Sequence, residues 1–398
     1  MSFESKQQRY LKKAIQDDAL ASSKMAFISG PRQVGKTTLA KSLLSNTKNH
    51  FLWEDEKFQK RWSKSAIDSL SEREMGPVIF DEIHKDRKWK NRLKGVYDKL
   101  GQELQIVVTG SARLDLFRKG GDSLMGRYLP YHLHPFSVAE TDSPIVPDRV
   151  LEFAFSKSKY SWEDLLNLGG FPEPFFGASE QKALRWSRLR LEQLFREDMR
   201  DLIAVVDVNA MKLLADFLVE RAGGLLSMNS LREDVSVAYG TIRNWIQVLQ
   251  SLYYCFLVRP YAGRLNRALK AEPKFYLFDI LRIPKSNFGA RRENLAALHL
   301  LKACQYWTDL AYGEFDLRYV RNKEKREVDF LILKDQKPWI LIECKSDDVS
   351  PHQGLGYFGD LLNVEHRFQL VSRENFDRSY PAYKTRILSY EKFFSNWV

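Results

Sequence analysis

Residues 30–38 read Gly30-Pro31-Arg32-Gln33-Val34-Gly35-Lys36-Thr37-Thr38. This run matches the pattern of two glycines separated by four residues and followed by lysine and a hydroxyl residue. Apolar residues 26–29 come directly before it, and a run with helical spacing begins at Lys36. A strand that leads through such a loop into a helix is the context in which this pattern binds phosphates. The alternative is a glycine turn with a coincidental lysine, which the flanking strand and helix disfavour.

Each residue type in this loop suits an oligophosphate ligand. Gly30 and Gly35 let backbone N–H groups turn toward phosphate oxygens, and the following helix adds its positive dipole end. Lys36 is expected to reach the β- and γ-phosphates, and Thr37 to give Mg²⁺ a hydroxyl ligand. Thr38 completes the predicted set. The sequence therefore predicts that ATP and ADP bind here together with Mg²⁺.

A second apolar run, residues 78–80, ends in two acids, Asp81 and Glu82. Asp81 is placed to hold Mg²⁺ through water, and Glu82 to polarise the water that attacks the γ-phosphate. Two acids after a strand can instead form a helix N-cap. Their position about 45 residues after a phosphate loop favours the catalytic interpretation.

Two further features follow the acidic pair. A third apolar run, residues 105–109, ends at Thr109-Gly110-Ser111, and Thr109 and Ser111 are equal candidates for contacting the γ-phosphate or the attacking water. A simple turn is the alternative there. Arg113, Arg118 and Arg127 follow, and one of them is expected to stabilise the charge of the transition state, within its own subunit or across a subunit boundary. Arg127 is favoured because the preceding glycine keeps the local backbone open.

These motifs together resemble those of a known family. The segments GPRQVGKTT, VIFDEIHK, VVTGSARL and LMGRY leading into HLHPFS look like the AAA+-type ATPases of the prokaryotic "ATP-binding protein" family. GGFPEP, residues 169–174, resembles the motif that follows the ATPase core there. The resemblance covers essentially the whole chain and is strongest over residues 27–136. It implies an AAA+-like P-loop ATPase followed by a C-terminal domain of unknown function.

Composition places the chain among soluble multidomain proteins. Its 398 residues correspond to two or three domains at about 150 residues each. No run of 18 apolar residues occurs, and three cysteines cannot form a disulfide framework, so we expect a cytoplasmic protein without a membrane segment. The formal charge of +11 favours polyanionic partners such as nucleic acid, although solubility alone could explain it.

The order of apolar and amphipathic runs predicts an α/β fold in several parts. We expect an AAA+-like P-loop ATPase core at residues 1–140, a linker and helical lid at 141–207, and a winged-helix domain at 208–284. A C-terminal α/β domain is expected at 285–398.

The predicted winged helix has the residue types of a DNA reader. Three helical runs, residues 211–223, 229–235 and 239–250, are joined by short turns. Arg243 and Asn244 lie on the third, where they are expected to contact bases and phosphates. Two β-like runs, residues 254–261 and 274–278, are expected to form the wing, whose basic residues are Arg259, Arg264, Arg267, Lys270 and Lys274. Use of this fold as an intramolecular clamp or oligomer contact is the alternative.

A predicted β-hairpin lies in the C-terminal part. If residues 334–338 form a five-residue loop, Leu333 pairs with Trp339 and Asp329 lies opposite Glu343. Lys345 then shares their face, whereas a four-residue loop would separate the acids. Two carboxylates and a lysine suit metal-dependent phosphodiester cleavage, with Asp329 and Glu343 holding Mg²⁺ or Mn²⁺.

This hairpin resembles the PD-(D/E)XK nuclease superfamily, whose pattern is an aspartate, a spacer and then E-x-K. The resemblance implies a restriction-endonuclease-like fold for residues 285–398. It also implies that Glu293 is the helix acid of that site, a further metal ligand, and that Lys345 is catalytic. Gln353 could match the glutamine of the following helix. Val328 stands where proline is often found. The alternatives are an acid–lysine cluster without chemistry and a nuclease fold retained for binding.

Three hypotheses follow. The first is an ATPase whose nucleotide state controls a DNA-directed, metal-dependent nuclease. The second is an ATP-switched DNA-binding or scaffold protein with a catalytically silent nuclease fold. The third is a regulator that acts on partner proteins. A homo-oligomer is compatible with each.

Overall fold

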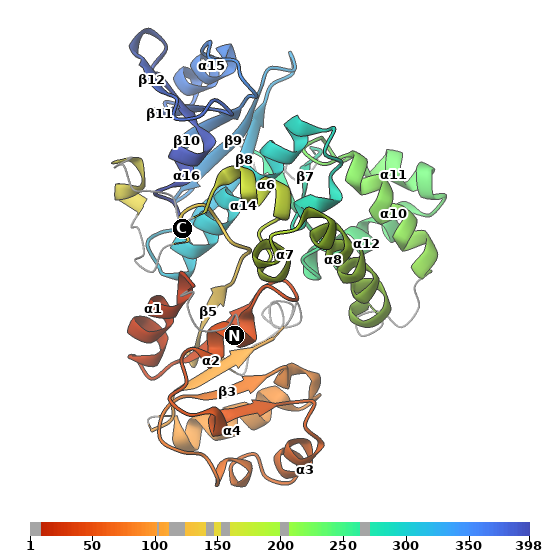
Figure 1. Ribbon diagram of the computed structural model, residues 1–398, viewed down its shortest axis with the longest axis vertical. Coiled ribbons are helices and arrows are strands. Elements are labelled where there is room, and N and C mark those ends of the chain that lie inside the picture. Colours follow the sequence, from red (N-terminus) through yellow and green to blue (C-terminus); the bar gives the residue numbers. More distant parts are fainter. Residues whose placement is uncertain are drawn as a thin grey trace. The chain divides into compact units, whose positions relative to one another are not determined.

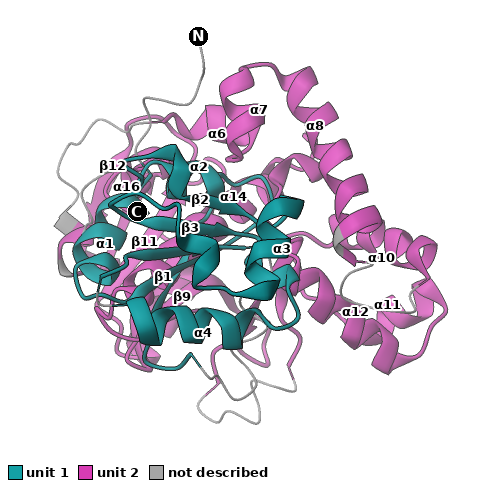
Figure 2. Ribbon diagram, turned by 90° about the horizontal axis from the view of Figure 1, so that it is seen from below, with its two compact units in different colours: residues 1–135, 141–144 teal, residues 136–140, 145–398 magenta. Residues whose placement is uncertain are grey.

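The computed structural model describes residues 9–101, 103–110, 124–140, 147–152, 160–199, 207–262 and 271–398. The chain divides into two compact units, coloured separately in Figure 2. The first comprises residues 1–135 and 141–144, and the second residues 136–140 and 145–398. Each unit is built around a β-sheet of its own.

The first unit contains the predicted parallel sheet (Figure 1). Its five strands lie in the order β2-β3-β4-β1-β5, and neighbouring strands pair in parallel. They are β1 (Met25–Ser29), β2 (His50–Leu52), β3 (Val78–Asp81), β4 (Ile106–Thr109) and β5 (Tyr128–His132). Because the strands are parallel, the carboxyl ends of β1, β3 and β4 meet at one edge, where open α/β sheets bind ligands.

Helices and aromatic side chains complete this unit. Every residue of β1, β3 and β4 is buried, as expected for a parallel sheet covered on both faces. Phe27, Trp62, Phe80 and Trp89 belong to one core cluster, in which the Trp62 and Phe80 rings lie 5.1 Å apart. The α-helices are α1 (Leu11–Ile15), α2 (Lys36–Lys41), α3 (Glu56–Lys64) and α4 (Trp89–Leu100).

The second unit holds an eight-stranded mixed sheet. Its order is β12-β13-β11-β10-β9-β8-β6-β7. The strands are β6 (Cys255–Pro260), β7 (Lys274–Leu277), β8 (Phe315–Arg321), β9 (Glu327–Lys334), β10 (Lys337–Cys344), β11 (His366–Val371), β12 (Asp377–Tyr380) and β13 (Thr385–Ser389).

The helices of the second unit include the three expected in its middle. The long helix α14 (Phe288–Asp309) is buried along most of its length and contacts β8. The other α-helices are α6 (Trp162–Leu168), α7 (Pro172–Gly177), α8 (Glu180–Gln193), α10 (Val208–Glu220), α11 (Met228–Val235), α12 (Tyr239–Ser251), α15 (Gln353–Leu361) and α16 (Tyr390–Phe394).

The expected wing is part of the large sheet instead. Strands β6 and β7 pair antiparallel, as a wing would, but β6 also pairs in parallel with β8 through Arg259↔Arg318 and Pro260↔Tyr319. The second edge of β6 is therefore occupied by the C-terminal sheet. Both expected boundaries, 207/208 and 284/285, fall inside the second unit.

The β9–β10 hairpin reaches the predicted register by a different route. Leu333 pairs with Pro338, not with Trp339, so the loop is shorter than five residues. A β-bulge between Pro338 and Ile340 then shifts the register, and Ile340 pairs with Ile332. This later register places Asp329 beside Glu343. The predicted loop length was wrong, and the bulge supplies the missing residue.

Candidate functional site

The predicted phosphate loop joins β1 to α2 and requires glycine at both ends. Gly30 has φ +149°, and a Cβ there would lie 2.2 Å from the carbonyl oxygen of Leu133. Gly35 has φ +98° and is the N-cap of α2. Side chains other than hydrogen rarely adopt these angles. The glycines thus allow the backbone to curl ahead of the helix N-terminus.

Lys36 lies inside this curl. Its residue is 7% exposed, and its Nζ donates to the carbonyl oxygens of Gly30 and Pro31 at 3.0 and 2.8 Å. The ammonium is therefore held over the loop itself, close to the amide groups of the first helical turn. A cation and oriented amides at a helix N-terminus form an anion-binding site.

Asp81, at the carboxyl end of β3, is the centre of a hydrogen-bonded cluster. Thr37 Oγ1 donates to Asp81 Oδ2 at 2.8 Å, and His50 Nε2 lies 3.2 Å from the same oxygen. Thr109 Oγ1 donates to Asp81 Oδ1. Burial alone would raise the pKa of this carboxyl, but the hydrogen bonds, that from His50 first, outweigh burial and hold the pKa below its ordinary value. Asp81 is therefore a carboxylate at neutral pH.

Glu82 follows in a left-handed conformation, with φ +57°. Its backbone N–H donates to the carbonyl oxygen of Thr109 at 3.0 Å, and its carboxylate lies 3.4 Å from His84 Nε2. Burial raises the pKa of Glu82, against the charges of Lys36 and Lys85. The raised pKa makes this carboxylate a stronger base than a solvated glutamate.

Two further residues of the predicted nucleotide site are described by the structure. Thr38 directly follows Thr37 on α2 and is exposed, and its contact with the nucleotide stays a prediction. Arg127 precedes Tyr128, which pairs with Met25 at the amino-terminal end of β1, whereas the phosphate loop follows the carboxyl end. Arg127 instead forms an ion pair with Asp98 at 2.7 Å. It therefore takes no part in the nucleotide site of its own chain, and action across a subunit boundary stays a prediction. Ser111, Arg113 and Arg118 lie outside the described residues.

The sequence motifs did not reveal His50. It begins β2, the edge strand beside β3, and pairs with Ile79, two residues before Asp81. Residues two apart in a strand share a face, so this pairing directs His50 toward Asp81. The proximity of His50 to Asp81 could have been predicted only from knowledge that β2 pairs with β3.

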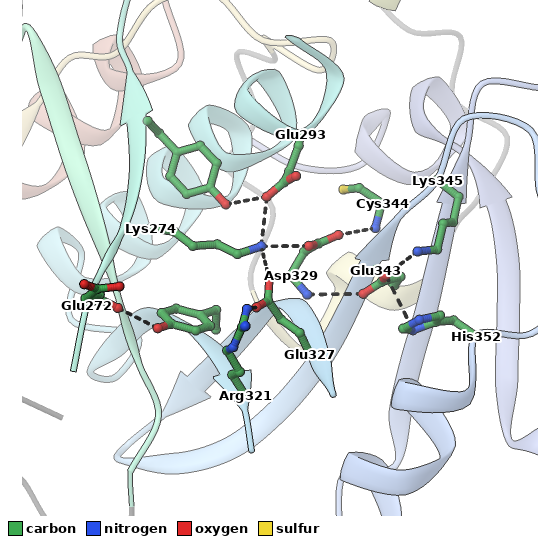
Figure 3. Close-up of polar contacts among 12 residues, drawn as sticks. Glu272, Lys274, Glu293, Arg321, Glu327, Asp329, Glu343, Cys344, Lys345 and His352 are labelled. Carbon is green, nitrogen blue, oxygen red and sulfur yellow. Dashed lines mark hydrogen bonds and ion pairs between the residues drawn. The ribbon is translucent and has the colours of Figure 1, made fainter. Parts of the chain in front are cut away.

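In the second unit, Asp329 and Glu343 are joined through the backbone of the hairpin (Figure 3). The N–H of Asp329 donates to Glu343 Oε2 at 3.2 Å, and the N–H of Cys344 donates to Asp329 Oδ2 at 2.9 Å. Lys345 Nζ lies 2.7 Å from Glu343 Oε1, and His352 Nδ1 lies 3.5 Å from that oxygen. Burial raises the pKa of Glu343, and the charge of Asp329 adds to the shift.

Lys274 of β7 contacts Asp329 and two further acids. We call Glu293, Glu327, Asp329 and Glu343 the carboxylate cluster. The Nζ of Lys274 lies 2.8 Å from Asp329 Oδ1, 3.0 Å from Glu293 Oε1 and 2.8 Å from Glu327 Oε1. The side chain is 3% exposed. Burial would lower the pKa of Lys274, but the surrounding negative charges outweigh burial and hold it well above its ordinary value. Figure 3 shows the ammonium between Glu293 and Asp329.

Two of the three predicted metal ligands, Glu293 and Asp329, therefore contact the ammonium of Lys274, and the third, Glu343, contacts that of Lys345. Among the residues that the structure describes, no three His, Cys, Asp or Glu side chains form a group able to hold a metal ion. Glu293, Asp329 and Glu343 do come near one another, as predicted, but through Lys274 and backbone amides. Lys274 was expected on the wing of a winged helix. Its role could not be found from sequence, because β7 reaches the cluster through pairing with β6.

The predicted DNA-reading side chains lie on the surface of α12. Arg243 and Asn244 are exposed, as are Tyr239 and Gln247 on the same helix. Arg264 and Arg267 lie outside the described residues. Of the helices that the structure describes, none has the length and apolar character needed to span a membrane.

Family models match three successive parts of the chain. An AAA domain matches residues 22–141, which contain the phosphate loop, Asp81 and Glu82. Two domains of unknown function, DUF8612 and DUF4143, match residues 159–280 and 288–387. The first unit is therefore an AAA-type P-loop domain, and the models attach no function to the second.

Similar proteins add breadth but no activity. Uncharacterized protein Rv2008c of Mycobacterium tuberculosis is 25% identical over 374 residues, covering 88% of this chain and 79% of that protein. Uncharacterized protein MJ1637 of Methanocaldococcus jannaschii is 23% identical over 371 residues, covering 80% and 75%. The Thermotoga maritima RuvB Holliday junction branch migration motor is 16% identical, with a TM-score of 0.29, covering 66% of this chain and 94% of that one.

Proposed function

We propose that the chain binds and hydrolyses ATP with Mg²⁺, and that nucleotide state switches a DNA-directed activity of the second unit. One observation carries the ATPase part. Lys36, Thr37, Asp81 and Glu82 converge at the carboxyl ends of β1 and β3, within a domain that matches the AAA model.

Each residue of this site has a separate role in the proposed reaction. The amides of the loop and the ammonium of Lys36 bind the β- and γ-phosphates. Thr37 Oγ1 and Asp81 Oδ2, 2.8 Å apart, are the hard oxygen donors that suit Mg²⁺, and these residues would hold the ion. Bound Mg²⁺ neutralises charge on the phosphate oxygens. Glu82 orients the attacking water and accepts its proton, a role favoured by its raised pKa.

Calorimetry on the full chain tests this proposal directly. ATP and ADP should bind in the presence of Mg²⁺, and phosphate should be released from ATP. A folded protein that takes up neither nucleotide would contradict the proposal.

DNA binding is proposed for the exposed face of α12. Support comes from Arg243, Asn244 and Gln247, side chains that can contact bases and phosphates, and from the formal charge of +11. Fluorescence anisotropy with a labelled duplex should show affinity that falls steeply with salt. Arg243→Ala should weaken binding, whereas Arg188→Ala, an exposed arginine on α8, serves as the matched control. Equal affinity of the two variants would contradict this assignment.

The carboxylate cluster supports two versions of the switched activity. The approach of Asp329, Glu343 and Lys345 favours metal-dependent cleavage, whereas the ammonium of Lys274 favours a nuclease-like fold without cleavage. We favour the second version. Plasmid cleavage with Mn²⁺ that Lys345→Ala abolishes would support the first. Salt-dependent DNA binding without cleavage supports the second, and absence of both leaves a regulator of partner proteins.

A further inference from the structure

The buried ammonium of Lys274 is surrounded by carboxylates. One ammonium contacts three carboxylates, those of Glu293, Glu327 and Asp329, at distances of 2.8 to 3.0 Å. The exposed Lys285 of the same unit, by comparison, pairs with Glu180. A buried charge requires close compensation, and here the compensation exceeds one negative charge.

The position of Lys274 is fixed by backbone pairing on both sides. Lys274 pairs with Val258 of β6 and forms a β-bridge with Leu225. The N–H of Leu226 also donates to the carbonyl oxygen of Pro273 at 2.8 Å. These backbone contacts hold β7, and with it Lys274, beside the carboxylate cluster.

Two of these carboxylates have a second hydrogen-bond or ion-pair partner that orients them toward Lys274. Tyr276 OH donates to Glu293 Oε1 at 2.7 Å, and Arg321 lies 2.6 Å from Glu327. Three carboxylate oxygens surround the ammonium at 2.8 to 3.0 Å, and oxygens of this kind are the ligands that a divalent cation takes when no ammonium stands between them. We propose that the ammonium of Lys274 is a built-in cation that fills the carboxylate cluster and closes it to divalent metal ions.

The inference does not depend on ATP hydrolysis, and it explains why the nuclease-like fold would be silent. A metal ion could enter only if β7 withdrew its lysine. The α10–α11 connection lies against this strand, since Gly223 N–H donates to the carbonyl oxygen of Phe275 at 2.8 Å. A Cβ at Gly223 would also lie 3.4 Å from Glu293 Oε2. Strand β7, which carries Lys274, therefore also contacts the connection between two of the three helices in the predicted DNA-binding domain.

Manganese binding to the full chain, without nucleotide or DNA, tests the inference. Free Mn²⁺ is measured by electron paramagnetic resonance for the parent protein, for Lys274→Ala and for Lys285→Ala as the matched lysine control. Lys274→Ala should gain one Mn²⁺ site over the parent, and Asp329→Asn in the same chain should remove it. The first unit is unchanged in every variant, so any Mn²⁺ bound there cancels from the comparison.

Thermal unfolding gives a second readout. Mn²⁺ should raise the unfolding midpoint of Lys274→Ala more than that of the parent, and Asp329→Asn added to Lys274→Ala should abolish this extra rise. If the alanine variant does not fold, Lys274→Gln keeps the length of the side chain without its charge and should behave in the same way. A folded charge-free variant that gains no Mn²⁺ site would overturn the inference. So would a parent protein that already binds Mn²⁺ and loses it with Asp329→Asn. DNA cleavage, measured separately, decides the nuclease question.

Discussion

The Oγ1 of Thr37 donates a hydrogen bond to Oδ2 of Asp81 at 2.8 Å, across 44 residues of sequence. This contact joins the first turn of α2 to the end of β3. It exists because β1 and β3 run in the same direction and end at the same edge of the sheet, with only β4 between them. Two oxygen donors are thereby set at the point where a nucleotide-bound Mg²⁺ is required.

Lys36→Ala should weaken nucleotide binding strongly. The ammonium is the charged group held inside the phosphate loop, and loss of a hydrogen bond to a charged group costs about 3 kcal/mol, or roughly 100-fold in affinity. Calorimetric titration with ATP and Mg²⁺ measures the change. Lys41→Ala, an exposed lysine on the same helix, should bind like the parent. Equal affinities of the two variants would show that the phosphates bind elsewhere.

Glu82→Gln should bind ATP but hydrolyse it slowly. The amide cannot accept a proton from water, and loss of general-base catalysis lowers rates by about 10²–10⁴-fold. Phosphate release and ATP affinity are measured on the same preparation. Glu56→Gln, an exposed acid in the same unit, controls for the loss of charge. Turnover at the parent rate would mean that another group positions the water.

The parallel sheet was predictable because its strands are buried on both faces and therefore appear as continuous apolar runs. The apolar residues of segment 89–100 have helical spacing, and this segment forms α4. The place of β6 was not predictable, since its neighbour β8 begins 55 residues after β6 ends and no local pattern specifies that pairing. The β6–β7 hairpin is compatible with a wing and with the edge of a larger sheet. Only the pairing of β6 with β8 distinguishes these two arrangements.

The same distinction applies to the sites. Thr37 and Asp81 were found because each belongs to a motif with a fixed spacing from its strand. His50 and Lys274 belong to no motif, and reach their carboxylates through pairing of neighbouring strands. The loop of the β9–β10 hairpin was misjudged because a bulge at one residue has the same effect on register as a longer loop.

His50→Ala should raise the Mg²⁺ concentration needed for half-maximal ATP hydrolysis. His50 contacts the same Asp81 oxygen as Thr37, so its loss leaves the carboxylate less firmly oriented. A hydrogen bond to a charged group contributes about 1.5 kcal/mol, which corresponds to roughly tenfold. Mg²⁺ titrations at saturating ATP measure the shift, with His366→Ala in the second unit as control. An unchanged Mg²⁺ dependence would show that His50 has no part in orienting Asp81.

Lys302→Met should destabilise the second unit strongly. Lys302 Nζ lies 2.6 Å from Glu140 Oε2 and 2.7 Å from Ser137 Oγ, and the side chains of Lys302 and Glu140 are 1% and 0% exposed. Removing one partner of a buried pair costs about 3–5 kcal/mol, because the other charge stays buried. Chemical denaturation measures the loss.

The double variant Lys302→Met, Glu140→Gln should recover most of that stability, since the two opposite charges of this pair are removed together. Lys285→Met breaks an exposed pair with Glu180 and should cost less than about 1 kcal/mol. A double variant as unstable as the single one would show that packing around Lys302, not charge, holds this region.

His299 should make the second unit sensitive to acid. Its Nδ1 lies 2.8 Å from the carbonyl oxygen of Leu295, and its Nε2 accepts from the N–H of Val138 at 3.0 Å, which fixes a neutral imidazole. Burial lowers the pKa of His299 to about 3, from 6.5 in the unfolded chain. The unfolded state therefore binds more protons between these values. The stability from His299 is present above pH 6.5 and is lost as pH falls toward 3, by at most about 1.4 kcal/mol per pH unit. His299→Leu should show a correspondingly smaller fall in unfolding midpoint from pH 7 to pH 5, and parallel profiles would mean that His299 titrates normally in the folded protein.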